Sequence, residues 1–296
     1  MRWIFVFAAL SDAEAISLRL EMLEGGARHD GRARDMKPDD RRQSIMDLLL
    51  EAGSASVEDM ANRFGVSRMT IHRDLDDLEQ AGLLRKVHGG ASIESSPQFE
   101  SDFRYRERIA LGEKREIAAR AAQLVEPGQI LMLDDSSTVG AMAPLLLDLR
   151  PLTVITTNLA VINALSGVAG ITLISLGGQF SKKFNGFFGI VAEEALKGLR
   201  ADAAFLSTSA IEGAQAFHQD QEVIQLKRRM LRSARKKYLL ADHDKFGRQA
   251  LHFFTGLDAF DAVLTGAAVS DAARQAVAEA GVPLMTTDTD RSEQAA

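Results

Sequence analysis

Two short amphipathic patterns on either side of a tight turn constrain this chain more than any other stretch of its sequence. The first begins at Ser56, a residue suited to cap a helix, and ends at Gly65. Between them, apolar residues recur at the spacing of one helical face: Val57, Met60, Ala61 and Phe64. A second helical pattern follows after Val66. The pair predicts a helix-turn-helix, the arrangement that places a helix in a DNA groove.

The second helix of this pair is expected to enter the groove by its N-terminal end. Its cap is Ser67, and at about 100° per residue its inner face consists of Ile71, Leu75 and Leu78. Asp76 and Asp77, further along the outer face, would be repelled by phosphate. The candidate DNA contacts are therefore the residues of the first turns: Ser67, Arg68, Met69, Thr70, His72 and Arg73.

A small β-hairpin is predicted directly after this helix. Residues 82–91 read as two short strands around Gly89 and Gly90, and they carry Arg85, Lys86 and His88. We expect these three side chains to contact DNA phosphates. The helix pair alone would also suit a surface that packs against a partner protein, but the added hairpin favours DNA.

Composition limits the other functions open to the chain. With 296 residues and 46% hydrophobic content, it can form a small domain and one larger core. Its net charge of -6 requires any nucleic-acid contact to come from a local patch. The absence of cysteine excludes disulfides, thiolate nucleophiles and cysteine zinc sites, and it fits the cytoplasm. Residues 242–244, Asp-His-Asp, lack a helix-spaced partner, so we expect neither a metal nor a cofactor.

Four boundaries divide the sequence. Residues 1–35 read as an extension outside either core; their apolar run of residues 3–10 is too short to span a bilayer, and no membrane association is expected. The DNA-binding domain is assigned to residues 36–92 and a polar, charged linker to residues 93–112. Residues 113–290 form the larger domain, and residues 291–296 are a tail.

The larger domain alternates buried strands with helical stretches. The strands are predicted at 130–133, 152–156, 171–176, 203–207, 238–241, 262–265 and 283–285. Repeated strand-helix order predicts an α/β fold, a mainly parallel sheet with helices on both faces. The chain as a whole is thus an N-terminal winged helix-turn-helix followed by an α/β domain.

Polar residues follow the first three of these strands. In open parallel sheets the ligand lies outside the carboxyl ends of the strands, so these loops are the candidate site. Hydroxyls and free backbone N–H groups at a helix start suit a phosphate, and glycines allow close backbone approach. The residues concerned are Asp134, Ser136, Ser137, Thr138, Thr157, Asn158, Gly177 and Gly178.

Both halves of the chain resemble the DeoR family of bacterial transcriptional regulators. In the first half the resemblance is carried by Arg41 or Arg42, by residues 70–75 (Thr-Ile-His-Arg-Asp-Leu) and by residues 83–85 and 88–91. In the second half it is carried by Lys114, residues 133–134, 157–158 and 177–178, Gly189, Glu222 with Lys227, and residues 240–242 and 245–247. It covers residues 36–285. Four positions depart from the family pattern: His72, Ser136, Ala210 and Gly266.

The resemblance implies a fold and a ligand for the larger domain. The fold is similar to that of ribose phosphate isomerases, and the implied effector is a phosphorylated sugar or polyol. Lys245 would then face the phosphate or a sugar oxygen, and Asp242 would orient hydroxyls. The competing reading is a sugar-phosphate isomerase or deaminase with an appended DNA module, for which Asp134, Asp135, Asp242 and Glu212 are candidate acids and bases.

We expect a repressor of a sugar or polyol catabolic operon that is relieved by its effector. Its partners would be double-stranded operator DNA and the phosphorylated metabolite. One recognition helix covers too few base pairs for specificity, so the chain should act as a homo-oligomer, a dimer or higher.

Overall fold

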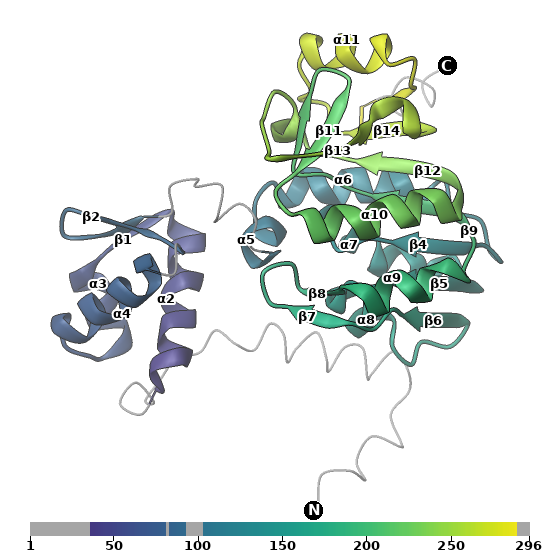
Figure 1. Cartoon of the computed structure of the whole chain (residues 1–296). Helices are drawn as coiled ribbons and strands as arrows, with labels where there is room; N and C mark the ends of the chain where they lie inside the picture. Colours follow the sequence, from purple (N-terminus) through teal and green to yellow (C-terminus); the bar gives the residue numbers. More distant parts are fainter. Residues whose placement is uncertain (1–35, 81–82, 93–102, 289–296) are drawn as a thin grey trace, which may run out of the picture. The chain divides into compact units, whose positions relative to one another are not determined.

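The computed structural model (Figure 1) describes residues 36–80, 83–92 and 103–288. The chain divides into two compact units, Met1–Glu94 and Ser95–Ala296. The predicted extension, the first residue of the predicted wing (Gly82), residues 93–102 of the predicted linker and the tail lie outside the described residues. Within the described part of the chain, no helix combines the length and apolarity needed to cross a membrane.

The N-terminal unit is a helix-turn-helix with a wing. Its elements are α2 (Pro38–Ala52), β1 (Ser54–Ser56), α3 (Val57–Phe64), α4 (Arg68–Gln80), β2 (Arg85–Val87) and β3 (Gly90–Ser92). The Ser56 hydroxyl accepts the Asp59 N–H at 3.0 Å, and Gly65 closes α3 in the left-handed region. All seven apolar residues predicted to face inward on α3 and α4 are buried. The sequence pattern did not reveal β1, because a three-residue strand of Ser-Ala-Ser shows no apolar alternation.

A buried ion pair fixes α4 against α2. Arg41 Nε donates to Asp74 Oδ2 at 2.6 Å, and Arg41 Nη2 donates to Asp74 Oδ1 at 3.1 Å. Both side chains are almost fully enclosed. Because this two-point contact has a defined planar geometry, it sets the position of the recognition helix as well as holding it.

Gly90 allows the wing to pair with β1. The three strands form an antiparallel sheet in the order β1-β3-β2, with Gly90 opposite Ser56. A Cβ placed on Gly90 would lie 2.3 Å from the carbonyl oxygen of Ala55, closer than any real contact. The neighbouring Gly89 has φ +76°, which lets the hairpin turn.

The C-terminal unit is built around a seven-stranded parallel sheet in the order β15-β14-β12-β9-β4-β5-β6. The strands are β4 (Ile130–Leu133), β5 (Leu152–Thr156), β6 (Ile171–Ser175), β9 (Ala201–Leu206), β12 (Ala234–Leu240), β14 (Ala262–Thr265) and β15 (Leu284–Thr286). Each corresponds to a strand predicted from the sequence, and the mainly parallel α/β fold is confirmed.

Helices cover both faces of this sheet. One face packs against α9 (Ile190–Lys197), α10 (Gln221–Ser233) and α11 (Asp271–Glu279), which run in front of the sheet or above it in Figure 1. The other face packs against α6 (Leu111–Ala122), α7 (Ser137–Gly140) and α8 (Leu159–Leu165). Successive strand residues alternate between the two cores, as Leu131 and Met132 do on β4.

The sheet reverses its strand order between β4 and β9. From β4 the chain moves outward through β5 and β6, whereas β9, β12, β14 and β15 extend in the opposite direction. The switch in strand order thus lies between β4 and β9, and in such folds a ligand usually binds outside the carboxyl ends of the strands at that point.

Three features of this unit were not predicted. A three-stranded antiparallel sheet consists of β10 (Ala210–Glu212), β11 (Gln215–His218) and β13 (His252–Gly256), and a hairpin consists of β7 (Gln179–Ser181) and β8 (Gly186–Phe188). Helix α5 (Phe103–Arg108) lies in the segment that we expected to be a linker, and Phe103 is 3% exposed.

We expect Gly90→Ala to destabilise the N-terminal unit by about 1 to 3 kcal/mol, because the added methyl group must push β3 away from β1. Gly112→Ala is the control, since a Cβ there meets no atom within 4 Å. Thermal unfolding of both variants tests this. Equal melting temperatures for the two would contradict the close β1–β3 contact.

Candidate functional site

The outer surface of α4 presents most of the side chains predicted to contact DNA. Arg68, Met69, His72 and Arg73 are exposed, Met69 to 65%. Ser67 has a structural role, because its hydroxyl accepts the Thr70 N–H at 3.1 Å and hydrogen-bonds the Thr70 hydroxyl at 2.9 Å. The two hydroxyls thus cap the helix from which the exposed residues project.

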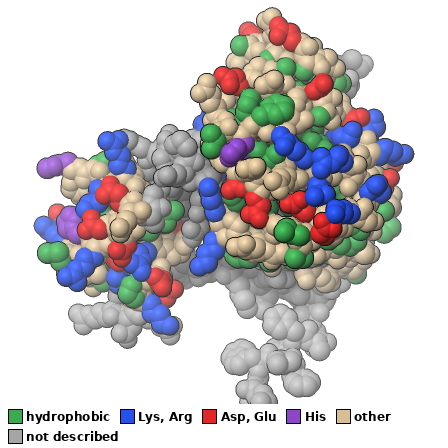
Figure 2. All heavy atoms as spheres, in the orientation of Figure 1, with side chains coloured by type: hydrophobic (Ala, Val, Ile, Leu, Met, Phe, Trp, Pro, Cys, Tyr) green, Lys and Arg blue, Asp and Glu red, His purple; other side chains and the backbone are tan. Residues whose placement is uncertain are grey.

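Ion pairs within this unit neutralise the acidic residues of α4. Asp76 pairs with Lys86 of the wing at 2.5 Å, and Asp77 pairs with Arg42 of α2. The hydrogen bond with Asp76 raises the pKa of Lys86. The charge repulsion expected from the two carboxylates is thereby reduced. Figure 2 shows acidic and basic side chains interspersed over the visible face of this unit.

We expect Arg73→Ala and Arg85→Ala to have different effects on DNA binding. If Arg73 reads a base, its loss should cost about 1 to 3 kcal/mol at the cognate site and relax sequence preference. If Arg85 of the wing contacts phosphate, its loss should weaken binding to every sequence and flatten the salt dependence. Binding of cognate and random duplexes across a salt series distinguishes them; identical behaviour of the two variants would contradict the assignment.

The loop after β4 is organised by Asp134, which is 1% exposed. Its Oδ1 accepts the Ser136 N–H at 2.9 Å, and its Oδ2 accepts the Ser207 N–H at 2.7 Å. The same Oδ2 accepts a short hydrogen bond from Lys227 Nζ. Since Ser207 follows β9, Asp134 joins the loop after β4 to the loop after β9. Both of its oxygens are used by the protein, so its role is to shape the site.

Asp135 presents an acceptor that the protein does not use. Its Oδ1 lies 2.8 Å from Lys227 Nζ, whereas its buried Oδ2 has no hydrogen-bond partner among the described residues. Burial alone would raise the pKa of Asp135, but the positive charges of Lys227 and Arg106 hold that pKa below its ordinary value. Asp135 is therefore an ionised acceptor, suited to a ligand hydroxyl and poorly suited to remove a proton.

His218 lies beside this cluster as a neutral ring. Burial, helped by the charge of Lys227, lowers its pKa to about 3. Its Nδ1 accepts the Asp220 N–H at 3.1 Å, so the proton of the neutral ring is on Nε2. At neutral pH His218 offers a hydrogen-bond donor and no charge.

Several residues predicted to bind ligand instead form hydrogen bonds or backbone contacts within the loops. Ser136 caps α7 through the Val139 N–H, and its φ of -76° explains why glycine is not needed there. Asn158 caps α8 and donates to the carbonyl oxygens of Asp134 and Ser136 at 3.3 Å. The close approach at Gly178 is to the backbone of Phe188 and involves no ligand. By contrast, a Cβ on Gly177 would meet no atom within 4 Å.

Three other predicted residues, Ser137, Thr138 and Thr157, lie buried in the loops after β4 and β5. Ser137 and Thr138 are buried at the start of α7. Thr157 is fully buried, and its Oγ1 has no partner among the described residues. The same holds for Thr265 Oγ1 at the end of β14. Because buried polar atoms normally find a partner, such atoms at one edge of the sheet indicate where a ligand or water binds.

The loop after β12 brings further charges to this edge. Asp242 is 3% exposed and lies 3.9 Å from the ammonium of Lys114, while Lys245 follows in a turn of 3-10 helix at His243–Lys245. Glu113 accepts from the His243 backbone N–H at 2.8 Å and contacts the ring Nδ1 at 2.7 Å. Across the described ranges, no three His, Asp or Glu side chains converge as metal ligands.

The space beside Gly266 is filled by Glu113. A Cβ on Gly266 would lie 2.2 Å from Glu113 Oε1. A carboxylate thus stands beside the end of β14, supplied by α6 instead of by residue 266.

Three residues of the site had been given no role in it: His218, which the sequence did not single out, and Lys114 and Lys227, which appeared only among the positions that carry the family resemblance. The sequence contains one indication that Lys227 is buried and paired, because it lies on the apolar face of α10 among Val223, Met230 and Leu231. A lysine at such a position is seldom buried unless it is paired. Nothing in the sequence identified its partners, because Asp134 and Asp135 are more than ninety residues away.

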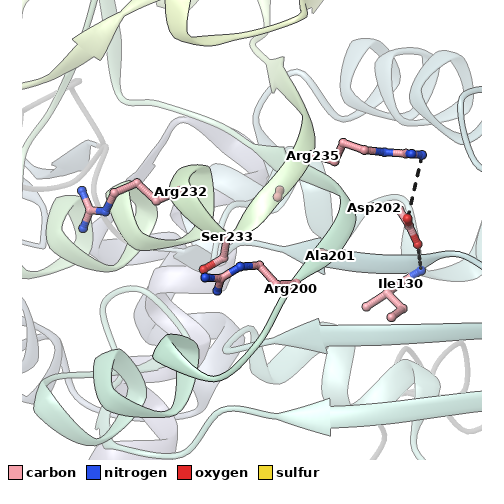
Figure 3. A pocket seen from close by; sticks show the side chains of 8 residues that line it. Ile130, Arg200, Ala201, Asp202, Arg232, Ser233 and Arg235 are labelled. Atoms are coloured by element: carbon pink, nitrogen blue, oxygen red, sulfur yellow. Dashed lines mark hydrogen bonds and ion pairs between the residues drawn. The ribbon is translucent and has the colours of Figure 1, made fainter.

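A cavity lies elsewhere in this unit, at the amino ends of its central strands (Figure 3). Its volume is about 350 Å³, and it is lined by Ile130, Arg200, Ala201, Asp202, Arg232, Ser233, Ala234 and Arg235. A second cavity adjoins it through Arg232 and Ala234. Because the strands are parallel, this edge is opposite the loops of the candidate effector site.

Both units match known protein families. Residues 41–97 match the DeoR-like helix-turn-helix domain, and residues 110–267 match the DeoR C terminal sensor domain. The chain belongs to the DeoR family. It is a transcriptional regulator with a DNA-binding unit and a sensor unit, and it is not the isomerase or deaminase considered as an alternative.

Relatives match about four fifths of this DeoR-family chain and are themselves covered almost completely. It is 31% identical to the glycerol-3-phosphate regulon repressor of Escherichia coli (strain K12) over 233 residues, 78% of this chain and 92% of that protein. It is 32% identical to the L-fucose operon activator of Haemophilus influenzae over 232 residues, 78% of this chain and 93% of that protein. Among solved structures, a ribose 5-phosphate isomerase from Methanocaldococcus jannaschii is similar with 18% identity and a TM-score of 0.33, covering 45% of this chain and 53% of that chain.

We expect Lys227→Met to destabilise the sensor unit by about 3 to 5 kcal/mol, because it leaves two buried carboxylates without a counter-charge. The control is Lys197→Met, whose partner Glu194 is exposed and whose loss should cost less than about 1 kcal/mol. Denaturant unfolding measures both. The triple change Lys227→Met, Asp134→Asn, Asp135→Asn should recover part of the loss, and a Lys227→Met variant as stable as the control would contradict the buried cluster.

Proposed function

We propose that this regulator represses a sugar or polyol catabolic operon and leaves its operator when a phosphorylated sugar metabolite binds the sensor unit. The observation that carries the proposal is the set of unpartnered buried atoms at the carboxyl edge of the sheet, Asp135 Oδ2 and Thr157 Oγ1. They can bind the hydroxyls of a polyol. Lys114 and Lys245 bring positive charge to the same edge, which suits the phosphate.

The relatives support a sugar or polyol ligand and leave the direction of control to be tested. One is a repressor of a glycerol-3-phosphate regulon and another an activator of an L-fucose operon. Repression follows if the ligand favours the conformation that binds DNA poorly. The size of induction then equals the ratio of ligand affinities in the two conformations.

The proposed assembly is a homo-oligomer. A single α4 reaches one half-site, and specificity requires a second recognition helix about one helical turn of DNA away. A second copy of the chain supplies that helix. Light scattering of the free and DNA-bound protein measures the stoichiometry.

The pair Thr157→Val and Thr156→Val tests the effector site. Thr157→Val should leave stability unchanged and weaken binding of a sugar phosphate by about two- to tenfold, because only the ligand uses that hydroxyl. Thr156 Oγ1 donates to the Leu133 carbonyl at 2.7 Å and accepts the Asn158 N–H at 3.0 Å, so Thr156→Val should lower the melting temperature.

Calorimetry with glycerol 3-phosphate, ribose 5-phosphate and unphosphorylated glycerol provides the binding data. If wild type and Thr157→Val bind with equal affinity, Thr157 has no part in the site. If only the unphosphorylated compound binds, the phosphate argument fails.

A further inference from the structure

Helices α9 and α10 form a layer over one face of the sensor sheet. They lie side by side in Figure 1, and an ion pair between Glu193 and Arg229 at 2.7 Å joins them. Each helix leads into a strand, and those two strands, β9 and β12, are parallel, so the helices run in the same direction. Their starts are accordingly adjacent, since a Cβ on Gly189 would lie 3.2 Å from Glu222 Oε1.

Helix α9 carries apolar residues on its outer side as well as on its inner side. Ile190 is 78% exposed and Val191 is 65% exposed, and both belong to the first turn. On the inner side, Ala192 and Leu196 are buried against the sheet. A surface helix normally has one apolar side and one polar side. The second apolar side of α9 therefore indicates a contact beyond its own sheet.

Opposite charges lie at the two ends of α10. Glu222 is in the first turn and Arg232 in the last; both are exposed, and neither has an ion-pair partner among the described residues. The two residues are about 15 Å apart along the helix axis. Arg228 of α10 and the exposed Arg200, which follows α9, add positive charge at the same end as Arg232. Figure 2 shows basic side chains gathered toward the right of this unit.

We propose that the outer side of the α9–α10 layer binds a second copy of this chain about a two-fold axis, with the two α10 helices antiparallel. This inference rests on the proposed function, in which the regulator acts as a homo-oligomer. In a two-fold contact one patch meets the same patch of the other copy, so each contact occurs twice. Glu222 of either copy then faces Arg232 of the other. Ile190 and Val191, beside Glu222, pack against the hydrocarbon stem of that arginine.

Charge complementarity favours a second copy as the occupant of this surface. A layer with one sign of charge would repel its own copy, whereas an acidic start and a basic end match each other when one copy is turned end to end. A parallel arrangement would bring Glu222 to Glu222 and Arg232 to Arg232, and like charges in contact oppose association. The apolar residues thus drive the contact, and the charges set its direction.

Charge reversal tests the contact. Glu222→Arg gives each copy two basic ends, and Arg232→Glu gives each copy two acidic ends. Either variant alone should associate at least about tenfold more weakly than wild type, because both symmetry-related contacts become repulsive. An equal mixture of the two variants should associate like wild type, since each copy then meets the opposite charge. Sedimentation velocity of the full-length protein over a concentration series, without DNA, measures the particle mass, which loss of this contact should halve.

Matched controls separate this surface from the rest of the molecule. Arg115→Glu reverses an exposed charge on α6, which covers the opposite face of the sheet, and should associate like wild type. Val191→Ser should weaken association by about two- to tenfold, whereas Met69→Ser, at a residue of the same 65% exposure in the DNA-binding unit, should leave it unchanged. Circular dichroism of every variant should match wild type, because all the altered side chains are exposed.

The outcomes distinguish this contact from the proposed assembly. If wild type is an oligomer and the charge reversals leave its mass unchanged, or if mixing the two variants fails to restore the wild-type mass, the α9–α10 contact is overturned while the homo-oligomer stands. If wild type is a monomer throughout the concentration series, the homo-oligomer is overturned and this contact with it.

Discussion

The sensor unit depends on one buried cluster, the ammonium of Lys227 between the carboxylates of Asp134 and Asp135. Three charges removed from water are tolerated only because each is paired and hydrogen-bonded. The Asp134 carboxylate also accepts hydrogen bonds from the backbone N–H groups of Ser136 and Ser207, so it joins the loop after β4 to the loop after β9. The same cluster leaves one oxygen of Asp135 facing no protein donor. The Lys227 cluster that joins the two loops therefore also holds Asp135 Oδ2 in place as an acceptor for a ligand.

The DNA-binding unit also contains a buried ion pair, with two charges in place of three. The Arg41–Asp74 pair is enclosed between α2 and α4, so the recognition helix is positioned by a two-point ionic contact as well as by its apolar face. Exposed ion pairs of Asp76 and Asp77 then reduce the local repulsion that those residues would present to phosphate. In both units, buried charges set geometry while apolar residues supply most of the stability.

The seven strands of the parallel sheet were predictable from the sequence because each contains a short apolar run between turn signals. This run is buried in the central strands β4, β5, β9 and β14, whereas β6 and β15 at the edges are partly exposed. The helix-turn-helix was predictable from its caps and its spacing. The antiparallel strands β10, β11 and β13 were missed because they are short and mostly pair at a distance, for example Phe217 with Phe253. The candidate site was likewise predictable only in part. The sequence located the loops after β4 and β5, and their role in binding a ligand stays a prediction. It could not show that Ser136 and Asn158 use their polar atoms within the protein, or that Lys227 contacts Asp134 from ninety-three residues away. Strand order determines those contacts, and strand order is set by packing between distant segments.

In the regulation that we propose, one ligand bound at the carboxyl edge of the sensor sheet lowers the affinity of the protein for its operator. Linkage makes this claim quantitative, because the factor by which ligand weakens DNA binding must equal the factor by which DNA weakens ligand binding. The direct measurement is a pair of titrations on the full-length protein: operator affinity by fluorescence anisotropy with and without a saturating sugar phosphate, and sugar-phosphate affinity with and without operator. We expect ligand to weaken DNA binding and DNA to weaken ligand binding by the same factor, above about fivefold. A sugar phosphate that binds the sensor unit while operator affinity stays unchanged would contradict it.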